Sequence, residues 1–439
     1  MRSIRLSAVV GALCLAAWPA IVSSQGLREL YESARAYDAN YLSALSQAQA
    51  AQYRVQQAEA LKRPSAAMTA DATLSRVDPE NLPGGNANSL RAGVSARLPL
   101  FNRQSDVTIT QTRKALSASQ ADLDAAEQDL IVRLTQAYFD VLAAQDSLGT
   151  NQASKAAIAE QLASAKRNFE VGTATITDTR EAQARYDLVL AQEIAAENLL
   201  RTRHIALDQL VGRSGVTPLG LPTPFVLPLL QPADPQAWVG TADAQHPAIR
   251  RARTALEIAQ LEIDRMRATG SPTLDAVGSV SANRNSGAYA SGFPGLNRTA
   301  AIGVQFNWPL YTGGLVDGRV KEAVALEDSA RNNLAAVQRG VSLNTRTAYY
   351  NVLSSAAEVR ALEAAEASNK LALEATQLGY KVGVRVNLDV LNAQTQLFET
   401  QRALARARYN ALVGSLLLRQ ASGQLGVSDI DATGALLLR

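Results

Sequence analysis

The chain has 439 residues, of which 47% are hydrophobic and 19% charged, and its 43 basic and 40 acidic side chains give a formal net charge of +3. This apolar content argues against a disordered chain, and the small net charge argues against a dedicated nucleic-acid binder. Because it has only two histidines and one cysteine, we expect no zinc site, no enzyme and no cofactor, which leaves a scaffold, a partner-binding protein or a conduit.

Residues 1–24 are typical of a secretory signal peptide. Arg2 and Arg5 form a positively charged region, an apolar stretch of about a dozen residues follows, and small residues precede a cleavage site before Gln25. The stretch is too short to span a bilayer, which takes about 20 residues. Lipidation of Cys14 is a poor alternative, because a leucine precedes it where a small residue is expected. We expect an exported protein that enters a membrane, if at all, as a β-barrel.

The mature sequence contains two long copies of one pattern, over 25–212 and 246–421. The segment Gln136–Leu142 returns as Thr347–Leu353, 211 positions later. At the same offset Gly172 and Asp178 return as Gly383 and Asp389. Two copies of this length predict a pseudo-symmetric chain rather than a solenoid of short repeats.

Proline usage indicates where long helices fit. Prolines are absent between Pro99 and Pro218 and after Pro309, and a proline inside a helix costs about 3 kcal/mol. Apolar residues three and four positions apart in these tracts predict amphipathic helices. Seven of the fifteen prolines lie between Pro218 and Pro247, which predicts an irregular, Pro-rich segment at 213–245.

Each copy contains a helical hairpin, over about 103–212 and 315–421. Its first helix extends for roughly 65 residues, or about 100 Å, to a turn that contains a glycine. The second helix of each hairpin begins near Ile176 and near Asn387. A further helix precedes the strands of each copy, and 422–439 form a C-terminal tail.

Between the helices of each copy the apolar period changes from about 3.6 residues to about 2, which predicts two strands over about 65–101 and two over about 273–311. The strands are apolar on one side and small or polar on the other, as in a membrane barrel with a wet lumen. Periodicity alone leaves open a half-buried sheet in a soluble protein. Aromatic residues gather at one end of the strands, where a membrane interface is expected: Phe101, Phe306, Trp308 and Tyr311.

Four strands have two unpaired edges, which a lipid environment does not tolerate. Closure therefore requires several chains. Two chains would give eight strands, with barely enough room for the side chains inside, whereas three would give twelve and a passage. We expect a homotrimer surrounded by outer-membrane lipid.

Three stretches of the chain resemble the TolC-like outer-membrane channels of type I secretion and multidrug efflux: Val171–Asp178, Phe306–Gly314 and Gly379–Ala393. The resemblance implies a mainly α chain with a membrane β-barrel portion, in which a trimer closes a 12-stranded barrel with four strands per chain. A long periplasmic α-helical barrel, built from the two tandem repeats, would continue it. The Pro-rich segment and the tail would form a belt around its middle, and the protein would lie in the outer membrane and extend into the periplasm.

The same resemblance implies a tunnel that is closed at its periplasmic tip by a latch. Arg385 and Tyr380 are similar to the residues that tie the inner hairpin to Asp178 and Thr177 of the outer one. Read without the family, an aspartate at a helix start is equally well explained as a cap that binds free backbone amides.

Two further positions are similar to the family's pore constriction. Asp389 corresponds to a member of an acidic ring, and Asn392 stands at the next ring position, where aspartate is common. A trimer would then bring three carboxylates to the constriction instead of six, which weakens the case for strong block by divalent cations.

The resemblance implies a passive exit duct that exports proteins as the outer component of a type I secretion system. Its partners would be a periplasmic adaptor (membrane fusion) protein and an inner-membrane ABC exporter or proton-driven efflux transporter, and no nucleic acid. The alternatives are the outer component of a tripartite multidrug efflux pump and, more remotely, a secreted coiled-coil structural protein. A periplasmic adaptor fits less well, because adaptors usually have one helical hairpin.

Overall fold

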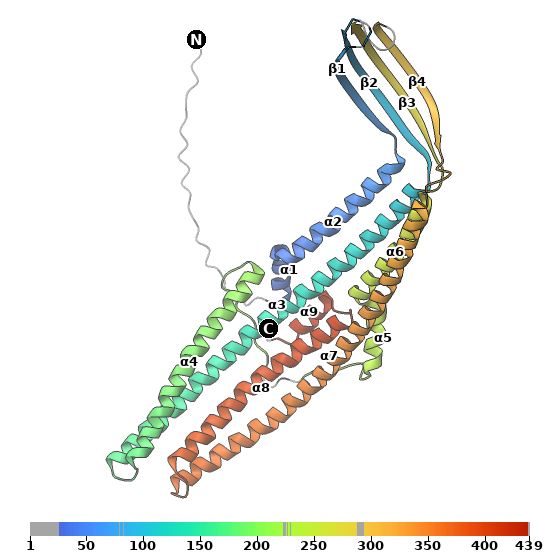
Figure 1. The fold of residues 1–439 in the computed structure, drawn as a ribbon. Helices are drawn as coiled ribbons and strands as arrows, with labels where there is room; N and C mark the ends of the chain where they lie inside the picture. Colours follow the sequence, from blue (N-terminus) through green and yellow to red (C-terminus); the bar gives the residue numbers. More distant parts are fainter. Residues whose placement is uncertain are drawn as a thin grey trace, which may run out of the picture.

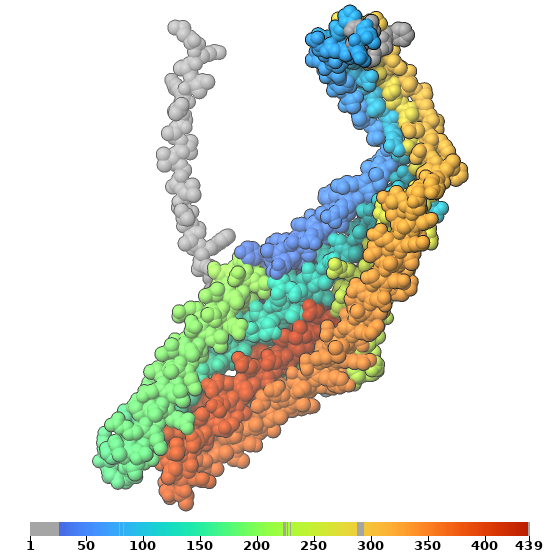
Figure 2. Space-filling view, in the orientation of Figure 1, coloured from blue at the N-terminus to red at the C-terminus, as the bar shows by residue number. Residues whose placement is uncertain are grey.

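The computed structural model describes residues 26–437, except 79, 82, 223, 224, 226, 229 and 288–293. The chain is long and narrow, with a β-sheet at one end and helices over the rest of its length (Figure 1). The helices pack side by side as a wall, and the sheet extends from one end of it at an angle (Figure 2). The predicted signal peptide lies outside the described residues.

Two helices extend along the whole wall, α3 (Arg103–Glu170) and α7 (Leu315–Lys381). With 68 and 67 residues at about 1.5 Å each, they are about 100 Å long, as the proline-free tracts predict. Among the residues that the structure describes, no helix has both the length and the apolar character needed to cross a membrane.

Four shorter helices complete the wall in two tiers (Figure 1). Near the sheet α2 packs on one side of α3 and α6 on the other; farther from the sheet α4 and α8 take these places, and α7 flanks both α6 and α8. The two tiers therefore have the same arrangement, one in each half of the wall. The bounds are α2 (Ala39–Glu59), α4 (Ile176–Val211), α6 (Pro247–Ala268) and α8 (Asn387–Ala421).

The strands form one antiparallel sheet in the order β1-β2-β3-β4. Their side chains alternate as the period predicts, and one face, here called the apolar face, has a row of cross-strand neighbours that consists of Met68, Val94, Val280 and Ala300. Within the described chain β1 and β4 are the edges of the sheet. The bounds are β1 (Ser65–Val77), β2 (Gly85–Asn102), β3 (Thr273–Gly287) and β4 (Gly295–Asn307).

The aromatic end of the sheet differs in part from the prediction. Phe101 and Phe306 lie on the two sides of Leu274 in one cross-strand row at the helical end. The last strand ends at Asn307, however, so Trp308 and Tyr311 lie in the connection to α7 and not in a strand. Pro309 lacks the N–H that a strand ladder needs, which explains this early end. All four aromatic side chains are exposed in the single chain.

The main apolar core lies at the middle of the wall. Buried residues of α3 pack there against α1 (Leu27–Tyr37), the end of α8 and the segments that follow α4 and α8. The Tyr138 hydroxyl, on α3, donates to the Leu219 carbonyl at 3.0 Å and accepts from the Leu219 amide at 2.6 Å. A smaller apolar cluster lies on α7, where Trp238 of α5 (Pro235–Gln245) packs against Tyr349.

The first and last helices of the described chain meet in this region. Arg28 of α1 binds Asp431 of α9 (Val427–Gly434) at 2.9 Å, and Asp429 of α9 accepts from Arg419 at 2.6 Å. At the start of α2 Asp38 accepts from Arg133 of α3 at 2.9 Å, and this guanidinium lowers the pKa of the Asp38 carboxyl. Leu219 of the 213–245 segment and the C-terminal helix are therefore fixed to the wall by specific polar contacts.

We expect Tyr138→Phe to weaken the middle of the wall, because the partly buried Leu219 amide and carbonyl lose their partner. The expected cost is about 1–3 kcal/mol, seen as a lower midpoint in thermal unfolding of the purified protein. Tyr53→Phe, at a tyrosine whose side chain is 62% exposed, is the matched control and should leave the midpoint unchanged. Equal midpoints for both variants would show that these hydrogen bonds do not hold the 213–245 segment.

Candidate functional site

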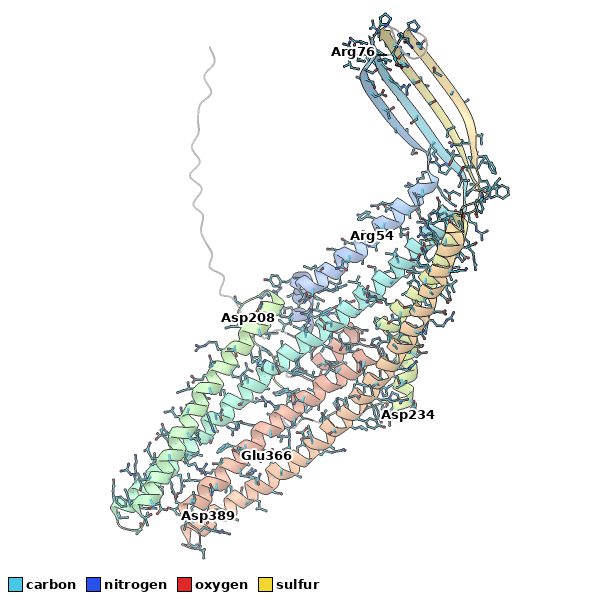
Figure 3. The ribbon with its side chains drawn as sticks, viewed as in Figure 1. Arg54, Arg76, Asp208, Asp234, Glu366 and Asp389 are labelled. Carbon is cyan, nitrogen blue, oxygen red and sulfur yellow. The ribbon has the colours of Figure 1, made fainter. Side chains whose placement is uncertain are left out.

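The two hairpin turns lie together at the end of the wall farthest from the sheet, here called the tip (Figure 1). Each turn contains a glycine with a positive φ, 78° at Gly172 and 83° at Gly383. This backbone conformation is costly for residues with a Cβ, so glycine allows each long helix to reverse within a few residues. Asp389, near the start of α8, is labelled at this end in Figure 3.

An apolar side chain of α8 joins the two hairpins near the tip. Leu391 is fully buried and packs in one cluster with residues of both helices of the first hairpin. The members of that cluster are Ile158, Leu162, Ala165, Ala182 and Val189. The beginning of α8 is therefore seated against α3 and α4 of its own chain.

Amide side chains continue this contact toward the tip. Asn387, 2% exposed, donates from Nδ2 to the Asp178 carbonyl at 3.3 Å and accepts through Oδ1 from Nε2 of Gln161. Closer to the turns, Asn168 donates to the Tyr380 hydroxyl at 3.2 Å. We call the contacts that Leu391, Asn387 and Tyr380 make with α3 and α4 the tip seam.

Two buried polar groups near the tip seam lack a hydrogen-bond partner within the part of the chain that the structure describes. Gln394 Oε1 and Thr179 Oγ1 are buried without a hydrogen-bond partner among the described residues. A buried polar group without a partner costs about 1–3 kcal/mol. The hairpins of one chain are thus joined by few and partly unsatisfied contacts at the tip, and by a large apolar core at the middle.

The predicted outer-hairpin latch residues have local roles within one chain. Asp178 closes a capping box at the start of α4: its Oδ2 accepts from the Thr175 amide at 2.9 Å, and its own amide donates to Thr175 Oγ1 at 3.2 Å. Thr177 beside it is exposed. The cap explanation of Asp178 therefore holds in the single chain, and the Asp178 carboxylate faces the tip with only local partners among the described residues.

The predicted inner-hairpin latch residues are found on the neighbouring turn. Tyr380 is bound by Asn168, and Arg385 lies 3.6 Å from Asp389, one helical turn later. Within the described chain, neither residue bonds to Thr177 or the Asp178 side chain. The structure thus brings the four latch residues to one end of the molecule, and the links between the two hairpins stay a prediction.

The two predicted constriction residues also lie on α8 at this end. The Asp389 side chain is 37% exposed. Asn392 accepts a hydrogen bond from Arg185 of α4 at 2.9 Å, a contact that the sequence did not predict. An aspartate at position 392 would form an ion pair with Arg185, whereas the asparagine gives a hydrogen bond to one charged partner only.

The sequence did not predict the hydrogen bonds between the hairpins that involve an amide side chain. These bonds are made by Gln161, Asn168, Arg185 and Asn387. One signal was available for Asn387, which lies four positions before Leu391 and seven before Gln394, on the buried side of α8. An amide within an apolar stripe indicates a specific polar contact. Among the described residues, no group of three or more His, Cys, Asp or Glu side chains is placed to hold a metal ion.

The chain is similar in sequence to known outer-membrane proteins. The family model described as outer membrane efflux protein matches residues 30–213 and 238–424. The outer membrane protein TolC of Vibrio cholerae is 33% identical over 426 residues, which cover 97% of this chain and 95% of that protein. The alkaline protease secretion protein AprF of Pseudomonas aeruginosa is 31% identical over 78% of this chain and 71% of its own length.

Solved structures have the same fold. The outer membrane protein VceC of Vibrio cholerae superposes with a TM-score of 0.75 at 21% identity, covering 90% of this chain and 96% of that one. Its likeness extends over both the sheet and the helical wall. The chain belongs to the outer membrane efflux protein family: it has the fold of trimeric outer-membrane channels, whose helical barrel lies in the periplasm, and it is a transport duct and not an enzyme.

Proposed function

We propose that this channel exports proteins, as the outer component of a type I secretion system. One combination of features supports the function of a duct. The sheet has one apolar face and two free edges, and it is joined to a helical wall about 100 Å long. A wall of this length suits passage across the periplasm without release of the cargo. The relative named for alkaline protease secretion, which matches over 78% of this chain, favours protein as the cargo.

A passive duct requires partners that supply energy. We propose a homotrimer that is joined by a periplasmic adaptor protein and by an inner-membrane ABC exporter or proton-driven transporter. The tip is the part of the chain that faces the inner membrane, so these partners would meet the hairpin turns.

A second candidate function is export of small toxic molecules as the outer component of a multidrug efflux pump. The description of the matching family model, outer membrane efflux protein, favours it. Both functions use the same duct and differ in the transporter that recruits it.

We propose that the tip is the gate of the duct. In the closed trimer, Arg385 and Tyr380 of one chain would bind Asp178 and Thr177 of the first hairpin, their own or a neighbour's. An exposed link of this kind contributes only about 0–1 kcal/mol. Three weak links, together with the incompletely satisfied tip seam, would give a closed state that contact with a partner can open.

Asp389 would form a ring of three carboxylates at the narrowest point. Like charges in a narrow, poorly hydrated passage attract cations and couple each other's protonation. Asn392 would add no charge to this ring.

Deletion of the gene tests which cargo uses the duct. We expect specific proteins to disappear from the culture medium while drug susceptibility stays unchanged, and a plasmid copy to restore secretion. Increased drug susceptibility with normal secretion would favour the efflux function. A purified protein that leaves planar bilayers electrically silent would exclude both and favour a coiled-coil structural protein.

The double variant Arg385→Ser/Tyr380→Phe tests the latch. It should destabilise the closed state by up to about 3 kcal/mol per trimer, at about 1 kcal/mol or less per link, and so raise single-channel conductance in planar bilayers. Lys381→Ser removes an exposed positive charge from the same turn and should leave the conductance unchanged. If the double variant conducts like the parent, the latch is assigned to the wrong residues.

A pair of variants tests the constriction. Asp389→Ala should weaken cation selectivity, measured as a reversal potential closer to zero in a salt gradient, because the ring loses its charge. Asn392→Asp should strengthen selectivity and increase block by divalent cations. Reversal potentials that are the same in both variants and the parent would place these residues outside the narrowest point.

A further inference from the structure

Two arginines interrupt the apolar face of the sheet near its loop end. Cross-strand partners of an antiparallel sheet share a face. From the aromatic end, the rows that β3 and β4 contribute to the apolar face contain leucine, alanine, glycine, valine, isoleucine and phenylalanine. The next two rows pair Ala282 with Arg298 and Arg284 with Leu296. Arg298 and Arg284 are therefore diagonal neighbours on adjacent strands, on the face that meets lipid.

Their height in the membrane follows from the strand geometry. Phe306 lies at the aromatic end, eight residues from Arg298 and ten from Leu296 along β4. At about 3.4 Å per residue and a tilt of about 40°, these separations are about 21 and 26 Å across the membrane. The apolar band of an outer-membrane barrel is about 25 Å tall. Both guanidinium groups are thus level with the lipid headgroups at the interface opposite the aromatic residues.

Neither guanidinium is neutralised by the protein in the part of the chain that the structure describes. Arg284 and Arg298 are exposed. Neither side chain forms an ion pair or a hydrogen bond with any of the described residues. Other arginines of the sheet differ. On the opposite face Arg97 binds Asp275 at 2.5 Å and Arg91 stands across from Asp71, while Arg76, near the loop end (Figure 3), binds Asp78 at 3.0 Å.

The surroundings of the two arginines fit a lipid. Leu90 and Leu296, the cross-strand neighbours of Arg284, are 57% and 59% exposed on the same face. They lie in the same cross-strand row as Arg284, at the outer edge of the apolar band, where they would contact the upper part of the acyl chains. A guanidinium offers a planar fork of donors that matches a phosphate group, and two such groups on adjacent strands can share one phosphate or bind two.

We propose that Arg284 and Arg298 form a site for the phosphate group of an outer-leaflet lipid, whose acyl chains lie along the apolar face toward Phe306. The site would fix the outer rim of the barrel at a set height in the membrane. A trimer would have three such sites. The inference depends on the position of the sheet in the outer membrane and not on which cargo the duct carries.

Binding of a phosphomonoester lipid to the purified, delipidated trimer tests the site. Phosphatidic acid in detergent micelles should raise the thermal midpoint of the parent protein, because a ligand that binds only the folded state stabilises it. Arg284→Gln/Arg298→Gln should bind about 30-fold more weakly, as expected for the loss of two basic side chains at a lipid surface. Arg284→Lys/Arg298→Lys should retain part of the affinity, because it keeps the charges and loses the planar fork.

The matched control is Arg91→Gln, on the opposite face of the sheet and one residue from Leu90. It should bind like the parent. Equal binding by the Arg284→Gln/Arg298→Gln variant and the parent would overturn the proposal, as would an equal loss in Arg91→Gln. Inorganic phosphate that gives the same shift would indicate a site for a free anion, and a neutral lipid that does so would indicate apolar packing alone; either result overturns the proposal.

Channel recordings separate this inference from the duct itself. In bilayers of neutral lipid, the Arg284→Gln/Arg298→Gln variant should conduct like the parent, because both side chains lie outside the lumen. A silent parent protein would contradict the proposed function and leave the lipid-binding measurement valid. Loss of conductance only in the double variant would place the arginines in the duct and overturn the lipid site.

Discussion

The need to pair every backbone N–H and C=O group in lipid constrains this protein more than any single contact does. One chain supplies four strands, so β1 and β4 each present an unpaired edge. Water can satisfy such an edge, whereas the apolar part of a membrane cannot. The barrel therefore exists only when three chains meet, and each chain is an incomplete wall until then. The helical wall is incomplete in the same way, because the helices at its two sides are also exposed in the single chain.

The wall is not equally stable along its length. At the middle, a large apolar core and buried hydrogen bonds such as those of Tyr138 fix the 213–245 segment and the C-terminal helix to α3. At the tip the same helices meet through a small apolar cluster and a few amide contacts, with buried groups that lack partners. A stiff middle and a weakly joined tip are suited to a tunnel that stays assembled while its end opens.

Most arginines of the sheet have a carboxylate partner, including Arg76 on the apolar face, which binds Asp78. Those on the polar face have carboxylates beside or across from them, as Arg97 has Asp275. Such pairing limits the charge that a passing cargo meets. On the apolar face, Arg284 and Arg298 have no such partner among the described residues and stand at the level where lipid phosphates are available.

The sequence by itself determined most of the elements and their order, but it missed the break between α1 and α2, and it predicted no helix where α5 and α9 form. Missing prolines, glycine turns and changes of period locate both long helices, both hairpins and all four strands, because these signals act within a few residues. Four strands that cannot close alone indicated an assembly of several chains, and the family resemblance implied the barrel and its helical continuation. The strand end before Pro309 was missed because apolar alternation continues past the last ladder hydrogen bond.

Only the tertiary structure decided which side chains meet at the tip. Asn387 contacts Gln161 and Asp178, more than 200 residues away in the chain, and Asn392 meets Arg185. These contacts depend on how α8 is rotated against α3 and α4, and packing along the whole wall sets that rotation. The register of the sheet likewise placed Arg284 beside Arg298. Local pattern specifies each element, whereas the partners of a side chain depend on how distant elements are aligned.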